Sequence, residues 1–482
     1  MTYVDRLSGG GFRELQSLLD GPFAGLFGGM HLLPFFWSID GADAGFDPID
    51  HARTDPKLGS WEDVRALARD KDLMADLIVN HVSSRSPQFE DFRKKGDASS
   101  YAGLFLSYGR VFSRGATESD LLQIYRLRTN LPFTSAKLED GTERLLWTTF
   151  TSEQIDIDVR SSAGKAYLEQ ILNQFHAVGV RVIRLDAAGF AIKKAGTSCF
   201  MLPETFDFIS ELTEQAHTLD MEVLVEMHGN YGDQIQIAKR VDWVYDFALP
   251  PLVLHALYTC KAGPLKHWFT IRPRNAVPVL DTHDGIGVID AGGLLTPAEI
   301  NGLVEGIHHW SNDQSRQASG AAANNLDLSQ VNCTFYDALG QRDAAYLIAR
   351  ALQFFSPGVP QVYYVGLLAG VNDMNLLSRT AEGRDINRHY YSPTEIAAAL
   401  QRPVVRSLAD LIRFRSTHEA FAGEFHLLPG GDEEISIEWR NGNQRARLDV
   451  ALKSMKGAVT FTVKGGEHRL ALVPGAFPEV IR

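Results

Sequence analysis

The chain has 482 residues and a formal net charge of −12, with 45% hydrophobic and 22% charged residues. This is the balance of an ordinary globular protein, and the length allows two or three domains or one large α/β barrel with additions. The acidic balance and the absence of a long basic run argue against nucleic acid or an anionic membrane as a partner, although one local arginine cluster is enough to bind a phosphate ligand.

Neither a leader nor a membrane anchor is expected. The opening residues, MTYVDRLSGG, lack the basic and apolar regions of a signal peptide. No apolar stretch reaches the ~18 residues of a membrane span. The three cysteines, Cys199, Cys260 and Cys333, show no CxxC spacing and fit idle thiols in a reducing compartment. We therefore expect a cytoplasmic protein.

Short apolar segments recur along the chain and predict eight β-strands. They lie at 2–7, 29–36, 74–82, 180–188, 221–229, 241–249, 276–284 and 359–366. Helical patterns separate several of them; Ser60 is expected to cap one helix, and Pro203 to begin another. Alternation of strands and helices indicates a parallel sheet, and eight strands favour an α/β fold of the closed (β/α)8 (TIM) barrel type. The alternative is an open doubly wound sheet, but no glycine-rich phosphate loop follows the first strand.

Two gaps interrupt this alternation, and a different pattern ends the chain. After the third strand comes an inserted subdomain, and after the seventh a second insertion; both would emerge at the C-terminal face of the barrel, where barrel enzymes build active sites. The tail alternates apolar and polar residues around an Asn441-Gly442 turn, which predicts a small antiparallel β domain. The predicted segments are barrel 1–82, 161–284 and 341–422, insertions 83–160 and 285–340, and β domain 423–482.

Three acids, Asp186, Glu226 and Asp284, lie at or near the C-terminal ends of the fourth, fifth and seventh predicted strands. In a barrel these ends meet at one mouth. One such acid is more often a helix cap or a solvated loop residue, but three on apolar strands are costly to bury unless they are paired or functional. Two facing carboxyl groups are the equipment of a retaining glycosidase, in which one attacks the anomeric carbon and the other protonates the leaving oxygen. A third acid can stabilise the cationic sugar ring.

Three basic or titratable neighbours support this interpretation. Arg184 shares a face of the strand with Asp186 and is expected to hold that carboxylate ionised and nucleophilic. His81 and His283 lie at strand ends of the same mouth and could donate hydrogen bonds to sugar hydroxyls. A zinc site is the competing interpretation, but the chain has no HExxH motif or tight His/Cys cluster, so we expect no metal and no other cofactor.

Four short motifs resemble the signature strands of the α-amylase-type glycoside hydrolases. They are DLIVNH (76–81), VIRLDAAG (182–189), LVEMHG (224–229) and LDTHDG (280–285). Longer stretches resemble the sucrose phosphorylase subfamily, notably LLPFFWSIDGADAGFDPIDH (32–51), YDFALPPLVLHAL (245–257) and GRDINRHYYS (383–392). The resemblance runs nearly from end to end and is thinnest in the C-terminal β domain.

The resemblance implies an activity and assigns the three acids to it. The reaction would be phosphorolysis of sucrose to α-glucose 1-phosphate and fructose, with Asp186 as nucleophile, Glu226 as general acid/base and Asp284 as transition-state stabiliser. Alternatives are the same chemistry on sucrose 6'-phosphate, glucosylglycerol or glucosylglycerate, and a sucrose hydrolase or transglucosidase. A non-catalytic scaffold with this fold is disfavoured because all three acids are present. The protein would be a monomer or homodimer.

The resemblance also implies two groups of binding residues. Those that surround the glucosyl unit are Asp43, Phe46, His81, Phe150, Gln154, Arg184, His283 and Arg388. On the acceptor side, Arg128 would bind phosphate, Asp327 and Gln330 would bind fructose, and His228 would lie nearby. Two departures also fall on the acceptor side, because Ser329 and Phe190 stand where sucrose phosphorylases usually carry tyrosines.

Overall fold

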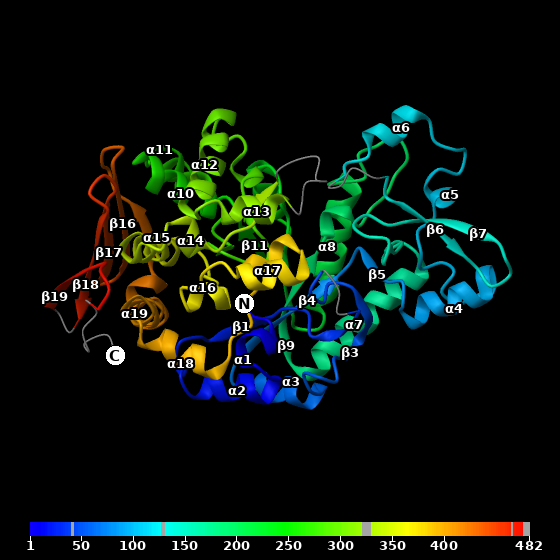
Figure 1. The fold of residues 1–482 in the computed structure, drawn as a ribbon, viewed down its shortest axis with the longest axis horizontal. Coiled ribbons are helices and arrows are strands. Elements are labelled where there is room, and N and C mark those ends of the chain that lie inside the picture. The colour runs from blue at the N-terminus through cyan, green and yellow to red at the C-terminus, as the bar shows by residue number, and fades with distance from the viewer. Residues whose placement is uncertain (40–42, 127–130, 321–328, 464–465, 476–482) are drawn as a thin grey trace.

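The molecule is elongated, with a β domain at one end, a central barrel, and an inserted subdomain at the other end (Figure 1). This computed structural model describes residues 1–39, 43–126, 131–320, 329–463 and 466–475. Apolar side chains of the barrel and of the C-terminal β domain form one continuous core.

A six-stranded parallel sheet, in the order β1-β4-β9-β10-β11-β12, forms most of the barrel wall. Its strands carry continuous apolar runs because parallel strands are covered on both faces. Their bounds are β1 (Gly29–Leu32), β4 (Asp72–Ile78), β9 (Val180–Asp186), β10 (Glu222–Val225), β11 (Trp243–Asp246) and β12 (Ala276–Pro278).

Two short extended segments close this sheet into a ring. Along β12, the N–H of Val359 donates to Ala276 O (3.1 Å) and that of Gln361 to Pro278 O (3.0 Å). Next to them, the Met1 amino group donates to Val362 O (2.8 Å). Thr2 completes the ring on β1, where its N–H donates to His31 O (2.9 Å). The predicted closed barrel is thereby confirmed.

The first and last predicted strands are wrong as strands, because each keeps only a few extended residues. Residues 2–7 pair at Thr2 and then enter helix α1 (Val4–Ser8), which ends at Gly9 in the left-handed conformation (φ 67°). Residues 359–366 turn into the short helix α16 (Tyr364–Leu367). Short apolar runs do not distinguish a strand from a buried helical turn, which explains both errors.

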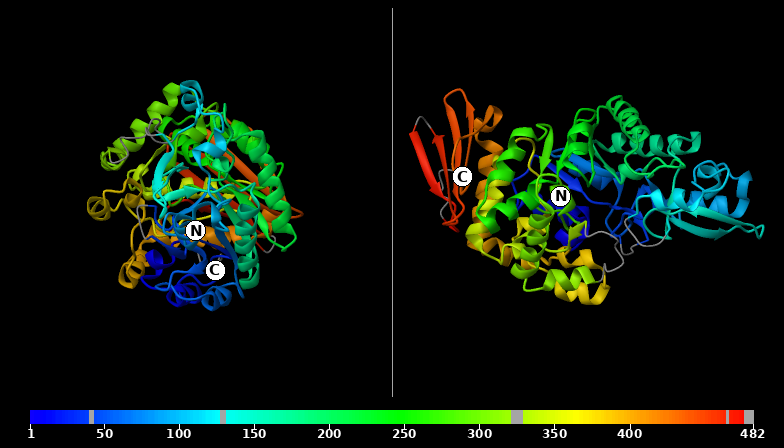
Figure 2. Two further views of the ribbon diagram at one scale, coloured as in Figure 1. Left: turned by 90° about the vertical axis from the view of Figure 1, so that its right-hand side faces the viewer. Right: turned by 90° about the horizontal axis from the view of Figure 1, so that it is seen from above.

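Helices cover the outside of the barrel (Figure 2). The predicted starts at Ser60 and Pro203 are confirmed: Ser60 precedes α3, where its N–H is bound by Asp63 Oδ2 (2.9 Å), and Pro203 begins α8. No helix among the described residues combines the length and apolarity needed to cross a bilayer. The main helices are α2 (Phe12–Asp20), α3 (Trp61–Leu67), α7 (Ser162–Val178), α8 (Pro203–His217), α9 (Tyr231–Ile237), α10 (Leu249–Thr259), α11 (Gly263–Ile271), α12 (Pro297–Trp310), α15 (Asp343–Phe355), α18 (Pro393–Gln401) and α19 (Pro403–Thr417).

The inserted subdomain is joined to the barrel mouth by a short antiparallel pair, β5 with β8, which sets His81 opposite Asp156 and Ser83 opposite Gln154. This pairing places Gln154, which lies near the C-terminal end of the inserted segment, at the barrel mouth. The subdomain elements are β5 (His81–Ser83), α4 (Pro87–Lys95), α5 (Tyr108–Val111), α6 (Glu118–Gln123), β6 (Phe133–Lys137), β7 (Glu143–Trp147) and β8 (Gln154–Asp156).

Smaller elements fill the loops at the mouth. One antiparallel pair, β13 with β14, sets Gly287 opposite Gln330. These elements are β2 (Phe36–Ser38), β3 (Pro48–Thr54), β13 (Ile286–Gly287), β14 (Gln330–Val331), α13 (Gln314–Gly320), α14 (Phe335–Ala338) and α17 (Met374–Thr380). The 3-10 turns are η1 (Gly96–Ala98), η2 (Ala188–Phe190), η3 (Ile289–Ala291), η4 (Gly383–Asn387) and η5 (Glu419–Ala422).

The C-terminal β domain is the predicted antiparallel sheet. Its five strands follow chain order, and Asn441 pairs with Gln444 around the expected turn. Ile435, Ile437 and Trp439 are buried while the residues between them face the other side, which is the alternation of a half-buried strand. The strands are β15 (Glu424–Leu427), β16 (Glu434–Asn441), β17 (Gln444–Ala451), β18 (Lys456–Val463) and β19 (Gly466–Ala471).

Candidate active site

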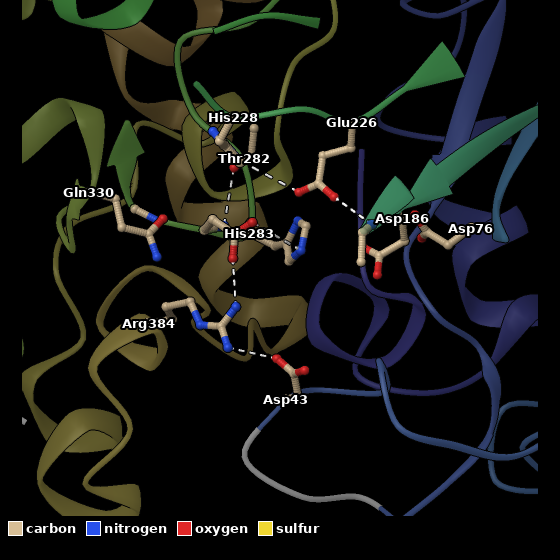
Figure 3. Close-up of polar contacts among 12 residues, drawn as sticks. Asp43, Asp76, Asp186, Glu226, His228, Thr282, His283, Gln330 and Arg384 are labelled. Carbon is tan, nitrogen blue, oxygen red and sulfur yellow. Dashed lines mark hydrogen bonds and ion pairs between the residues drawn. The ribbon is translucent and has the colours of Figure 1, made fainter. Parts of the chain in front are cut away.

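The three predicted acids come together at the C-terminal side of the barrel strands, and Figure 3 shows Asp186 and Glu226 next to each other there. Asp186 is the last residue of β9 and Glu226 follows β10 directly; pairing of Leu185 with Val225 sets the two acids side by side. Asp284 lies on the loop after β12, because that strand ends earlier than predicted, at Pro278. All three side chains are largely buried, at 11%, 13% and 12% exposure.

Arg184 binds three carboxylates at once. Its Nη1 lies 2.5 Å from Asp76 Oδ1 and 2.9 Å from Asp186 Oδ1, and its Nη2 lies 3.0 Å from Glu226 Oε1. Asp76 stands opposite Arg184 in the β4–β9 pairing, and its second oxygen is 3.1 Å from His31 Nε2. The guanidinium therefore fixes the positions of both candidate reactive carboxyls relative to each other.

The protonation of Asp186 differs from the prediction. Burial, and then the charge of Glu226, raise the pKa of the Asp186 carboxyl well above its ordinary value, and together they outweigh the opposing Arg184. Arg184 is shared among three carboxylates, and its charge offsets only part of the effect of burial and of Glu226 on Asp186. The prediction that Arg184 holds the Asp186 carboxylate ionised is therefore wrong, because the pKa of Asp186 is shifted upward and not downward.

Asp284 is held by Arg384, which the sequence had not singled out. Arg384 Nη1 lies 2.8 Å from Asp284 Oδ1. Its Nη2 lies 2.6 Å from Asp43 Oδ1, and Figure 3 shows Arg384 pointing toward Asp43. Burial opposes ionisation of Asp284, but its neighbours His283, Arg384 and Arg388 hold its pKa well below the ordinary value. Since burial lowers the pKa of His283 to about 3, the two arginines carry this effect at neutral pH. Asp284 is thus a fixed negative charge.

Arg388, the predicted glucosyl-binding arginine, lies next to Asp284 and His283. It is fully buried, its Nε donates to His283 O (2.7 Å), and its Nη2 comes no closer than 3.8 Å to Asp284. The two arginines, Arg384 and Arg388, are one helical turn apart on and just after η4. The direct contacts therefore belong to Arg384, and Arg388 supports the loop that carries His283.

Aromatic and imidazole rings line the other side of the site. Phe46 stacks on His283 with 4.8 Å between ring centroids, and its carbonyl accepts hydrogen bonds from His81 Nε2 (2.8 Å) and Gln154 Nε2 (3.1 Å). Gln154 Nε2 also donates to Asp43 Oδ2 (2.6 Å). Phe150 packs edge-on against His81. The structure therefore joins these predicted residues into one connected group of contacts.

His228 and Gln330 lie on the outer side of Glu226. The Nδ1 of His228 is 3.0 Å from Asp290 Oδ2, and its Nε2 is 3.6 Å from Glu226 Oε1. Burial by itself lowers the pKa of His228, but Asp290 and then Glu226 and Asp284 raise it to about 9. His228 is therefore a cation at neutral pH. Gln330 is fixed by its Oε1, which accepts from the N–H of Gly285 (3.0 Å).

Two predicted site residues cannot be placed, and three residues of the site were not predicted. Arg128 and Asp327 lie outside the described residues, so their roles stay predictions. Sequence reasoning missed Asp76, Arg384 and Asp290. An acid inside the apolar strand of DLIVNH was an available signal for Asp76, and the first arginine of GRDINR was one for Arg384. Asp290 carried no signal, because its partner His228 is distant in sequence.

One group of side chains in the described part of the chain has the spacing of a metal site. Potential ligand atoms of Glu226, His228 and Asp284 lie within 4.8 Å of one another. Each of them is already engaged, by Arg184, Asp290 and Arg384 respectively. The donor set is therefore accounted for by ion pairs within the protein.

Comparisons with known proteins agree with this geometry. Residues 26–249 match the α-amylase catalytic domain family. The chain is 59% identical to the sucrose phosphorylase of Agrobacterium vitis, over 95% of this chain and 96% of the relative, and 52% identical to that of Bifidobacterium adolescentis, over 97% and 96%. The crystal structure of sucrose 6F-phosphate phosphorylase from Thermoanaerobacter thermosaccharolyticum superimposes with a TM-score of 0.91 at 40% identity, over 97% of this chain and 96% of that one.

The fold and the three acids at its mouth are those of an α-amylase-type catalytic barrel. Within that class, the chain belongs to the family of the sucrose phosphorylases and their close relatives. It is an enzyme.

Proposed function

We propose that this enzyme catalyses the phosphorolysis of sucrose to α-glucose 1-phosphate and fructose, with retention of the anomeric configuration. The observation that carries the proposal is the bridge made by Arg184 between Asp186 and Glu226, which fixes two carboxyl groups side by side at the ends of neighbouring strands. The high identity to two sucrose phosphorylases over nearly the whole chain supports the choice of substrate.

In the first step, an Asp186 oxygen attacks the anomeric carbon of the glucosyl unit while the bond to the fructosyl oxygen breaks. Glu226 donates its proton to that leaving oxygen, so fructose departs neutral and a glucosyl ester remains on Asp186. Positive charge grows on the sugar ring in the transition state. Asp284, kept ionised by the arginines around it, supplies the opposing charge.

In the second step, phosphate displaces Asp186 from the anomeric carbon. The ionised Glu226 takes the proton of the attacking hydrogen phosphate oxygen, and α-glucose 1-phosphate leaves with Asp186 restored as a carboxylate. Two inversions give net retention. Asp43, Gln154 and Arg384 form a connected polar group that suits the binding of sugar hydroxyls throughout.

A second candidate function is the same chemistry on a related α-glucoside. Two residues on the acceptor side support this candidate. Ser329 lies beside Gln330 at the mouth, and Phe190 packs against Phe150 and Phe200, with ring centroids 5.2 Å and 4.7 Å away. Neither side chain supplies the phenolic hydroxyl that sucrose phosphorylases usually carry there. The residues on the acceptor side therefore specify the second substrate less closely than the other residues specify the glucosyl unit.

The test is phosphate-dependent release of glucose 1-phosphate from four substrates at equal concentration: sucrose, sucrose 6'-phosphate, glucosylglycerol and glucosylglycerate. We expect the largest kcat/KM for sucrose. A larger value for another substrate would move the assignment to that substrate, and glucose release without glucose 1-phosphate would make the enzyme a hydrolase.

A further inference from the structure

Asp290 is a completely buried carboxylate just outside the group of residues used in the proposed mechanism. It lies on η3, and its side chain is 0% exposed. Its Oδ2 is 3.0 Å from His228 Nδ1, and its Oδ1 accepts from the N–H of Gly229 (2.9 Å) and from Gln234 Nε2 (3.5 Å). Burial of a charge is costly unless it is paired, and here the pairing partner faces the acid/base residue.

The segment that carries Asp290 also holds the acceptor side in place. The N–H groups of Val288 and Ile289 both donate to Ser329 O, at 3.1 and 3.3 Å. Gly287 pairs with Gln330, and a Cβ at Gly287 would lie 2.2 Å from Asp290 Oδ2. Asp290 is therefore packed tightly between the loop after β10 and the strand that begins with Gln330.

The hydrogen bond to Asp290 decides which way the His228 ring points. With Nδ1 held by Asp290, the Nε2 faces Glu226 Oε1 at 3.6 Å, and the ring face stacks on Phe247 with 4.1 Å between centroids. The charged groups that act on the ring are Asp290, Glu226 and Asp284, all acidic. The nearby arginines are bound to the last two of these acids: Arg184 to Glu226 and Arg384 to Asp284.

We propose that Asp290 is a positioning residue for the transfer step, which holds the His228 ring with Nε2–H facing Glu226 and the acceptor that arrives beside it. This inference rests on the proposed function. Once fructose has left, Glu226 is a carboxylate, and an anionic acceptor approaching it meets like charge. An imidazolium fixed at this point offsets that repulsion for phosphate, whereas neutral water does not need it. Asp290 therefore favours phosphorolysis over hydrolysis.

The variant Asp290→Asn keeps the size of the side chain and removes its charge. We expect the phosphate KM to rise about tenfold, and the ratio of hydrolysis to phosphorolysis to rise by a similar factor, the loss of roughly one charged interaction. The matched control is Asp242→Asn, which removes the acid of a second Asp–His pair: Asp242 Oδ2 is 2.9 Å from His217 Nε2 and also accepts from the N–H of Val223. The control should leave both quantities unchanged.

A double-mutant comparison separates positioning from a loss of structure. In a His228→Gln background, Asp290→Asn should add no further increase in the phosphate KM, because the effect acts through the ring. Histidine titration followed by NMR in the free enzyme gives a readout independent of turnover, and Asp290→Asn should move the His228 midpoint downward from about 9.

Three outcomes would overturn the inference: an unchanged hydrolysis ratio in Asp290→Asn, additive effects in the double variant, or an unshifted His228 midpoint. If Asp290→Asn fails to fold, His228→Gln alone must reproduce the rise in phosphate KM. Failure of the proposed function looks different, since the wild-type enzyme would then release no glucose 1-phosphate from sucrose while the NMR result still stood.

Discussion

Arg384 and Asp43 are 341 positions apart in the chain, yet Nη2 of the arginine lies 2.6 Å from a carboxylate oxygen of the aspartate. The other terminal nitrogen of the arginine binds Asp284. One side chain thus connects the loop after β2 with the loop after β12, and it links Asp43 to Asp284.

Replacing this arginine should therefore damage both substrate binding and the transition state. Arg384→Ala removes two charge-assisted hydrogen bonds of about 1.5–3 kcal/mol each, so kcat/KM for sucrose should fall by about 10²- to 10⁴-fold. The measurement is initial-rate kinetics of glucose 1-phosphate release. Arg379→Ala, at an exposed position on α17, is the control. An Arg384→Ala enzyme within threefold of the control would contradict this account.

The elevated pKa of Asp186 predicts a trade between activity and stability. Its pKa in the folded state lies above the unfolded value of about 3.9. Between those two values the folded state binds more protons than the unfolded one, so stability falls as pH rises. Asp186→Asn removes this penalty; it should abolish turnover and raise the Tm more at pH 7 than at pH 4. A Tm gain that does not depend on pH would show that the pKa of Asp186 is not raised in the folded state.

Glu226 has a role that depends on the leaving group. Fructose departs as an alkoxide unless a proton reaches it, whereas fluoride leaves without one. Glu226→Gln should lower turnover of sucrose by about 10²- to 10⁴-fold and spare the glucosylation step with α-glucosyl fluoride. Burst kinetics with both substrates measure this step directly. Equal losses on the two substrates would remove Glu226 from the acid role.

Ser329 gives a prediction about the acceptor. Its carbonyl is fixed by Val288 and Ile289, and its side chain is only a hydroxymethyl group. Ser329→Tyr replaces this short hydroxyl by a phenolic hydroxyl on a longer side chain; the phosphate KM should fall by about ten- to a hundredfold, the value of one hydrogen bond to a charged ligand. The range of alternative acceptors should narrow in the same variant. Unchanged phosphate affinity and acceptor range together would refute this view of the position.

Activity should not depend on a bound metal. The only described group with metal-ligand spacing, Glu226 with His228 and Asp284, is engaged in ion pairs. We expect full activity after exhaustive dialysis against a chelator, assayed by glucose 1-phosphate release. A loss that added calcium or zinc restores would reverse this expectation.

The sequence predicted the barrel and its three acids because both follow from local patterns. Apolar runs mark β9, β10 and β12, and each acid ends such a run or follows it within one loop. Arg384 was missed because two arginines four positions apart look alike in sequence, and only packing shows that Arg384 bridges Asp284 and Asp43. The direction of the Asp186 pKa shift was mispredicted for a similar reason. Arg184 also binds Asp76 and Glu226, which lie on or just after other strands, and a local pattern does not reveal these contacts.

The closure of the barrel has a consequence for how the chain folds. Met1 and Val362 meet across 361 positions of sequence, and Thr2 then binds His31. During synthesis the extended segment at Met1 and Thr2 has only one neighbour in the barrel, β1, until residues 359–362 have left the ribosome. Long-range pairing of this kind is slow to form because a large loop must close before any contact compensates. The ring is therefore completed late, and until then the open edge of β12 is exposed to other chains, so that crowding at this stage should govern the yield of folded enzyme.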